Sequence, residues 1–240
     1  MLNENSSIRV ANVIARGSYN LTLMEQRLLI IIISSLQNPE CNAWEDTASN
    51  KNSITLDLYE IRKLLKRDPT AGVLQYFNSL FSDLAEKHII FTTDEGVTTD
   101  TCWFTITSIY LGDGYVTIEI PATLVPYLLN LKKCFASVKL STVIALKSKH
   151  TLRLYLLLKS YAHKGLYACD LIKLHTVIGT ADAYRKYFSR FKADILTPAI
   201  AEIHRSTELA IDVEQLKRSR KVTRLVFKIS KSDRAVNEHN

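Results

Sequence analysis

The chain has 240 residues and is 47% hydrophobic, which is enough for the cores of two ordinary domains and excludes global disorder. Its net charge of +7 is unevenly divided: residues 1–131 hold 9 Lys+Arg against 15 Asp+Glu, a net of −6, and residues 132–240 hold 22 against 9, a net of +13. A half this basic predicts an anionic partner, usually nucleic acid, because each cation set against a phosphate releases a counterion. The two halves are therefore expected to have different tasks.

Several classes of protein lack support in the sequence. The cysteines (Cys41, Cys102, Cys134 and Cys169) show neither C-x-x-C spacing nor a histidine at zinc spacing, which indicates free thiols in a reducing cytoplasm. The apolar run 28–33 is too short to cross a bilayer, and the N-terminus lacks the pattern of a secretory signal. No glycine-rich phosphate motif, H-x-H or acidic cluster in the basic half indicates catalysis. We therefore expect a cytoplasmic protein without enzymatic activity, cofactor, metal ion or membrane partner.

The first half predicts helices followed by strands. Thr22 and Glu25 have the spacing of a capping box, so a helix is expected to begin near Thr22. Asp57 begins a second helix, which Pro69 ends, and the Gly112-Asp113-Gly114 segment predicts a hairpin. The expected order is helix 22–36, loop 38–52, strand 54–56, helix 57–68, helix 73–86, strands 88–92, 102–111 and 115–120, and helix 121–131.

The second half repeats this order. Ser148 can cap a helix that runs to residue 162, Asp170 begins a helix that Gly179 closes, and a third helix covers 184–205. Strands at 209–213 and 222–229 follow, joined by a basic turn. The order of helix, short strand, helix, helix and hairpin in both halves predicts two winged helices.

The predicted fold class is therefore α+β, with two tandem winged-helix domains. A short echo between Tyr76-Phe77 and Tyr187-Phe188, 111 positions apart, agrees with a duplicated module. The polar stretch around Lys132-Lys133 is the expected junction. The expected boundaries are 1–133, 134–231 and a tail at 232–240.

The third helix of the second half is the first candidate for DNA contact. Tyr184, Tyr187, Phe188, Phe191 and Ile195 follow helical spacing and predict one buried stripe. On the other faces, Arg and Lys can reach guanine, Ser and Thr can read either edge, and Ala permits close approach. The candidates for reading bases are Ser189, Arg190, Lys192, Ala193 and Thr197. The alternative is a solvated face of an amphipathic helix.

Basic residues around this helix are candidates for contact with the DNA backbone. They lie in the turn and last strand of the final hairpin, at the start of the third helix, and at the start of the helix that Ser148 caps, where backbone N–H groups also favour phosphate. The candidates are Lys147, Lys149, Arg153, Arg185, Lys186, Lys217, Arg218, Arg220, Lys221 and Arg224. A solubilising turn and a solvated helix are the alternatives.

Four segments of the chain are similar to the motifs of a known family. Residues 19–27 (YNLTLMEQR) resemble the motif YNLSLTEQRL, and residues 147–155 (KSKHTLRLY) resemble SKYSIRLYELLK. Residues 191–203 resemble FKxxVLxPAIxEIN, and residues 217–229 resemble KxGRKVxxIxFxI. In this combination the chain resembles the iteron-binding Rep initiators of theta-replicating bacterial plasmids. Ser219 stands where the family often has Gly, and His204-Arg205 also departs from its pattern, which leaves the base preference open.

The resemblance implies a sequence-specific initiator of plasmid replication. The C-terminal winged helix would enter the major groove of origin direct repeats, and the N-terminal one would contact nearby backbone and carry the dimer interface. Monomers would bind the repeats and, with the host initiator, help to load the host helicase, whereas dimers would bind an operator inverted repeat and repress their own gene. The residues alone leave open a dimeric winged-helix repressor and a module that binds an acidic protein.

Overall fold

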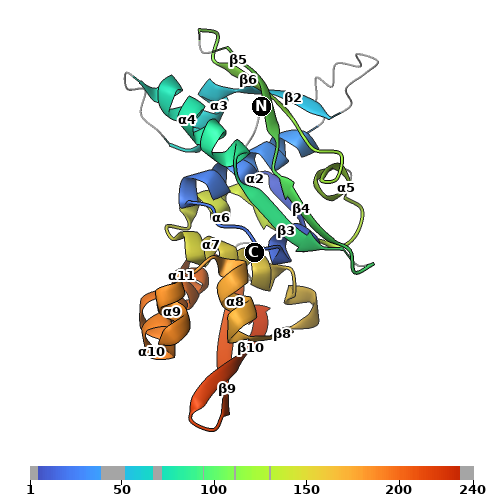
Figure 1. Cartoon of the computed structure of the whole chain (residues 1–240). Helices are drawn as coiled ribbons and strands as arrows, with labels where there is room; N and C mark the ends of the chain where they lie inside the picture. The colour runs from blue at the N-terminus through green and yellow to red at the C-terminus, as the bar shows by residue number, and fades with distance from the viewer. Residues whose placement is uncertain are drawn as a thin grey trace, which may run out of the picture. The chain divides into compact units, whose positions relative to one another are not determined.

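The chain folds into two compact units in the computed structural model (Figure 1). The described residues are 5–38, 52–66, 72–93, 95–110, 112–129 and 131–232. Unit 1 comprises Met1–Gly17 and Leu21–Ile144, and unit 2 comprises Ser18–Asn20 and Ala145–Asn240. The expected tail lies outside the described residues except for Ser232.

The division between the units lies at Ile144 and not at residue 133. Strand β7 (Phe135–Lys139), which the expected boundary assigns to the second domain, pairs antiparallel with β1 (Ser7–Ala11) of unit 1. The residues in register run from Ser7 opposite Lys139 to Ala11 opposite Phe135. The backbone of β7 therefore satisfies its hydrogen bonds within unit 1.

Unit 1 is a winged helix with added strands. Its remaining elements are α1 (Asn12–Arg16), α2 (Leu23–Gln37), β2 (Ser53–Asp57), α3 (Leu58–Leu64), α4 (Val73–Ala85), β3 (His88–Thr92), β4 (Thr98–Cys102), β5 (Thr105–Tyr110), β6 (Tyr115–Glu119), α5 (Val125–Leu128) and α6 (Leu140–Ala145), which ends at the boundary. The wing sheet has the order β2-β6-β5, and β3 pairs with β4. The predicted helices beginning near Thr22, Asp57 and Val73 are confirmed.

Helix α2 is the central helix of the unit 1 core. The predicted capping box is present, because Thr22 N–H donates to Glu25 Oε2 (2.8 Å) and Glu25 N–H donates to Thr22 Oγ1 (3.3 Å). Every side chain from Leu28 to Leu36 is buried, the polar Ser34 and Ser35 included, so the helix has no solvent-facing side over this stretch. Glu25 also forms an ion pair with Lys87 (2.6 Å).

Two predictions in unit 1 are wrong. The predicted strand 102–111 is divided, since Cys102 ends β4, which pairs with β3, and β5 begins only at Thr105. The predicted helix 121–131 is reduced to the four residues of α5, in which Pro126 occupies the first turn. Proline is compatible with a first turn and not with a helix interior, because it lacks the N–H donor. Residues 39–51 of the expected loop 38–52, and the expected helix break at Pro69, lie outside the described residues.

Unit 2 repeats the winged-helix order, as predicted. Its elements are α7 (Lys149–Lys159), η1 (Ala162–Lys164), β8 (Leu166–Asp170), α8 (Leu171–Ile178), α9 (Asp182–Lys186), α10 (Phe188–Phe191), η2 (Lys192–Leu196), α11 (Thr197–Ser206), β9 (Leu209–Arg218) and β10 (Lys221–Lys231). The sheet order β8-β10-β9 matches β2-β6-β5, so in each unit the short strand pairs with the second strand of the hairpin. The predicted fold of two winged helices is confirmed.

The predicted helix 184–205 is interrupted twice. Tyr187 has extended backbone angles (φ −127°, ψ 96°) and separates α9 from α10. Residues of η2 form a π-turn, in which Thr197 N–H donates to the carbonyl of Lys192. Pro198 follows, and its ring would clash with the carbonyl of Asp194 in a regular helix, so a wider turn at this point relieves that contact.

Candidate nucleic-acid interface

The recognition segment, defined as residues 182–197 (α9, Tyr187, α10, η2 and the first residue of α11), presents the predicted base-reading residues on its outer side. Its inner side is held by Phe191, whose ring lies 4.4 Å from that of His175 on α8, and by the buried Ile195 and Leu196. The residues Ser189, Arg190, Lys192, Ala193 and Thr197 are all exposed. Together with α8 the segment forms the helix-turn-helix of unit 2.

The turn between α8 and the recognition segment depends on Gly179. This residue ends α8 with a positive φ of 66°, which a residue with a side chain rarely adopts. A Cβ atom there would also lie 3.3 Å from the carbonyl oxygen of Tyr19. Gly179 therefore fixes the angle at which the recognition segment leaves α8.

Arginines on the recognition segment are held by neighbouring side chains. Arg190 Nε lies 3.4 Å from Asp194 Oδ2, and its guanidinium carbon lies 5.5 Å from the centre of the Tyr184 ring. Arg185 Nε lies 3.3 Å from Asp182 Oδ1. Exposed pairs of this kind are weak, so a phosphate or a base edge can replace the carboxylate.

The β9–β10 hairpin carries the predicted basic turn at its tip and projects beyond the helices of unit 2 (Figure 1). Arg218 pairs with Lys221, which leaves Ser219 and Arg220 as the connection, and Ser219 has a positive φ of 57°. We define the basic wing as Lys217, Arg218, Arg220 and Lys221, all of which are exposed. Farther along the hairpin, Arg224 Nε forms an ion pair with Asp170 Oδ1 (3.1 Å).

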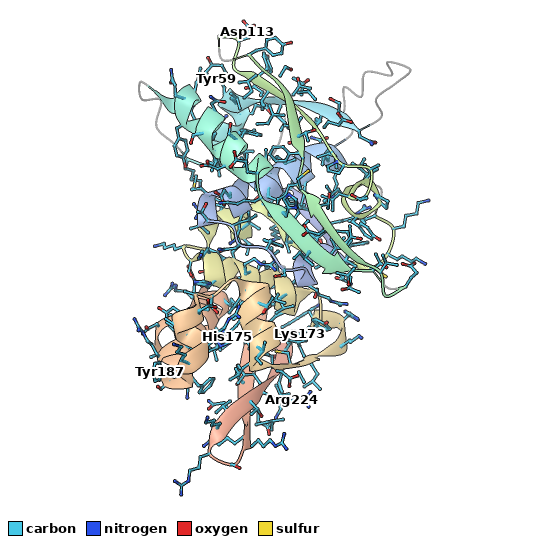
Figure 2. All side chains as sticks on the ribbon, viewed as in Figure 1. Tyr59, Asp113, Lys173, His175, Tyr187 and Arg224 are labelled. Carbon is cyan, nitrogen blue, oxygen red and sulfur yellow. The ribbon has the colours of Figure 1, made fainter. Side chains whose placement is uncertain are left out.

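The equivalent hairpin of unit 1 has the opposite character. Its tip carries Tyr110, Asp113 and Tyr115, and residues 88–131 contain neither Lys nor Arg. Figure 2 shows Asp113 at this tip, near Tyr59 of α3. A hairpin of this composition repels phosphate, so only the hairpin of unit 2 is suited to the DNA backbone.

The start of α7 supplies two of its three predicted cations. Ser148 caps the helix, since its Oγ accepts hydrogen bonds from the N–H groups of His150 and Thr151. The Lys147 side chain is exposed, and Lys149 Nζ lies 3.3 Å from Asn20 Oδ1. Both ammonium groups can therefore reach an anion near the helix start.

The third predicted cation, Arg153, is not at the surface, and its expected phosphate contact is wrong. Its side chain is 1% exposed, and Nε and Nη2 donate to the carbonyl of Val177 (3.1 and 2.8 Å). Nη1 donates to the Tyr19 hydroxyl, and the guanidinium lies 3.6 Å from the centre of the Tyr19 ring. Burial lowers the pKa of Arg153 and raises that of Tyr19. The guanidinium therefore stabilises the interior of unit 2.

His175, which packs against Phe191 of the recognition segment, makes the stability of unit 2 depend on pH. The side chain is buried, its Nδ1 lies 2.7 Å from Thr180 Oγ1, and burial together with the nearby Arg185 charge lowers its pKa from 6.5. Above pH 6.5 the folded and unfolded forms are both neutral, and the contribution of His175 is complete. Below pH 6.5 the unfolded chain binds a proton at His175 more readily than the folded chain does. The free energy of unfolding therefore decreases as the pH is lowered.

We expect the melting temperature to fall less between pH 7.5 and pH 5.5 in a His175→Asn variant than in the unaltered chain. The Asn amide can keep the contact with Thr180 but has no proton to gain. Thermal unfolding followed by circular dichroism measures the difference. His163→Asn, at an exposed position, is the matched control. An equal fall in all three proteins would contradict the role of His175.

The described residues contain no helix that is long and apolar enough to cross a membrane. Within the same residues, no group of three or more His, Cys, Asp or Glu side chains is arranged to hold a metal ion. Cys102, Cys134 and Cys169 are free thiols, and Cys41 lies outside the described ranges.

Two family models and one solved structure agree with the two winged helices. Family models described as "Initiator Replication protein, WH1" and "Initiator Rep protein, WH2" match residues 7–159 and 171–229. The Pi initiator protein, solved in complex with iteron DNA, has a similar fold, with 19% identity, a TM-score of 0.69, and coverage of 97% of this chain and 100% of that chain. Domains 2 and 3 of RctB match with 10% identity, a TM-score of 0.49, and coverage of 88% and 83%.

A search of curated proteins finds no match to the sequence. The family models nevertheless match well over half of the chain, the first over the N-terminal winged helix and the second over the C-terminal one. The chain belongs to the family of Rep replication initiator proteins.

Proposed function

We propose that this protein initiates plasmid replication by binding direct repeats, or iterons, at an origin. The single observation that carries the proposal is the exposed cationic surface of the recognition segment and basic wing in the second winged helix of a Rep-family chain. The recognition segment would enter the major groove, and the basic wing would follow the backbone. The fold shared with the Pi initiator, solved on iteron DNA, supports this assignment.

Unit 1 has a different part in the proposal. It would carry the self-association surface and contact DNA backbone at few points, because its sequence is net negative. Lys63 is exposed and available for such a contact, whereas Arg9 Nη1 donates to the carbonyl of Leu131 (2.9 Å). Monomers would bind iterons and, with the host initiator and helicase, open the origin. Dimers would bind an operator inverted repeat and repress the gene.

The decisive experiment is a test of replication. Duplexes that bind the full chain are selected from a random pool, and an array of the selected site is placed beside an A·T-rich tract on a circular DNA without another origin. We expect this DNA to be maintained in a bacterial host only when the chain is supplied. Selection of a site without maintenance would favour the alternative, a winged-helix repressor, and failure to select any site would contradict both.

A matched pair of lysines tests the base-reading role. Replacing Lys192 by alanine is expected to weaken binding to the selected site by about 1–3 kcal/mol and to change binding to random DNA little. Lys192 forms no ion pair with any other described residue, so its removal leaves no unpaired carboxylate there. Lys139→Ala, at an exposed position on β7, is the control. Fluorescence anisotropy on both duplexes measures the effect, and equal losses on the two would make Lys192 a backbone contact.

A further inference from the structure

Tyr187 differs from the other aromatic residues of the recognition segment. Its spacing predicts a place in the buried stripe with Phe188 and Phe191, yet its side chain is 64% exposed. Because the backbone is extended at Tyr187, this residue does not share the helix face on which Phe191 points inward. Its ring makes no hydrogen bond or ring contact with any other described residue. Tyr187, which is labelled in Figure 2, lies between the short helices α9 and α10.

Packing does not explain a large aromatic ring at this position. The contact with α8 is made by Phe191, whose ring lies 4.4 Å from His175 and 6.3 Å from Phe188. A small polar residue at position 187 would satisfy the same backbone break and would avoid exposing an apolar ring to water. The exposed ring is therefore available to a ligand.

The surroundings of Tyr187 indicate which ligand this is. Arg185, Lys186, Ser189 and Arg190 flank it in sequence and are all exposed, so the ring lies within the cationic surface assigned to DNA. Residues at the start of a recognition helix are those that reach base edges in helix-turn-helix proteins. An aromatic ring there meets the one apolar group on the floor of the major groove, the 5-methyl group of thymine.

We propose that the ring of Tyr187 reads a thymine by contact with its 5-methyl group, an inference that rests on the proposed function. The hydroxyl group remains free to face water or the backbone, so the contact depends on the ring and not on the phenolic oxygen. A platform for single-stranded bases uses several rings in succession, and Tyr187 is a single exposed ring beside cations. Duplex DNA is therefore the favoured partner.

The test removes the methyl group alone. In duplexes that carry the selected site, each thymine is replaced in turn by 2′-deoxyuridine, and binding to the full chain is measured by fluorescence anisotropy. We expect one replacement to weaken binding by about fourfold, the effect of one buried methyl group. Tyr187→Ala should bind the unaltered site more weakly and become insensitive to that replacement, whereas Tyr187→Phe should keep the sensitivity.

Two controls separate this contact from other effects. Tyr110→Ala removes an exposed tyrosine of unit 1 and should keep the response to deoxyuridine, and thermal unfolding should show that Tyr187→Ala is as stable as the unaltered chain. The inference is overturned if no thymine shows a response that depends on Tyr187, or if the variant loses single-stranded and duplex binding alike. If the unaltered chain selects no site, the proposed function itself fails, and this inference falls with it.

Discussion

Replacing Arg153 by alanine is expected to lower the free energy of unfolding of unit 2 by about 3–5 kcal/mol. The substitution removes a large, fully buried side chain, leaves the carbonyl of Val177 without two of its donors, and leaves the Tyr19 hydroxyl without the guanidinium. Chemical denaturation of the full chain, followed by circular dichroism, measures the loss. An exposed phosphate contact would instead leave stability nearly unchanged.

A lysine at position 153 separates the structural role from a role in DNA binding. Arg153→Lys keeps the positive charge but cannot donate to Val177 and Tyr19 together in the planar arrangement of a guanidinium. We therefore expect Arg153→Lys to be destabilised as well. Lys149→Ala, one turn earlier on α7, removes a partly exposed charge and should have little effect on stability. Full recovery of stability and DNA affinity in Arg153→Lys would argue for the phosphate contact.

The same contact limits how the chain can be divided. Tyr19 lies far from Arg153 in sequence but belongs to unit 2, together with Ser18, whose hydroxyl donates to the carbonyl of Thr176 (3.3 Å). A fragment that begins at residue 134 or 145 lacks Tyr19. Loss of DNA binding by such a fragment would therefore reflect damage to unit 2 as well as the absence of unit 1.

Local signals in the sequence were sufficient to predict the repeated fold. The capping box at Thr22, the cap at Ser148 and the glycine at position 179 mark helix ends through hydrogen bonds and backbone angles set within a few residues. The hairpin at Gly112–Gly114 is equally local. Because both units use such signals in the same order, the two winged helices could be predicted without any knowledge of long-range contacts.

Features that depend on distant residues could not be predicted in this way. Nothing near β7 indicates that it pairs with a strand at the start of the chain, so the boundary predicted at residue 133 falls before a strand that belongs to unit 1. The burial of Arg153 has one local sign, since α7 is apolar on nearly every side and its middle is therefore a buried helix. Helical spacing placed Tyr187 in the core, and the backbone break that exposes it has no clear signal in the sequence.

Removing the charge of the basic wing is expected to change how DNA binding depends on salt. If Arg218, Arg220 and Lys221 each contact a phosphate, alanine at all three should reduce the slope of log affinity against log salt by about 2.7, at roughly 0.9 per contact. The loss should be similar on the selected site and on random duplexes, because phosphates carry no sequence information. Anisotropy titrations over a series of salt concentrations give the slope.

The control for this experiment must remove the same net charge elsewhere. Lys139, Lys164 and Lys231 are exposed and lie outside the basic wing, so alanine at these three positions lowers the net charge equally. Direct phosphate contacts release counterions, whereas distant charges only steer the encounter and are screened beyond about 10 Å at 0.1 M salt. The slope should therefore fall in the wing variant and stay close to that of the unaltered chain in the control. Equal slopes in the two variants would show that the basic wing does not lie on the DNA backbone.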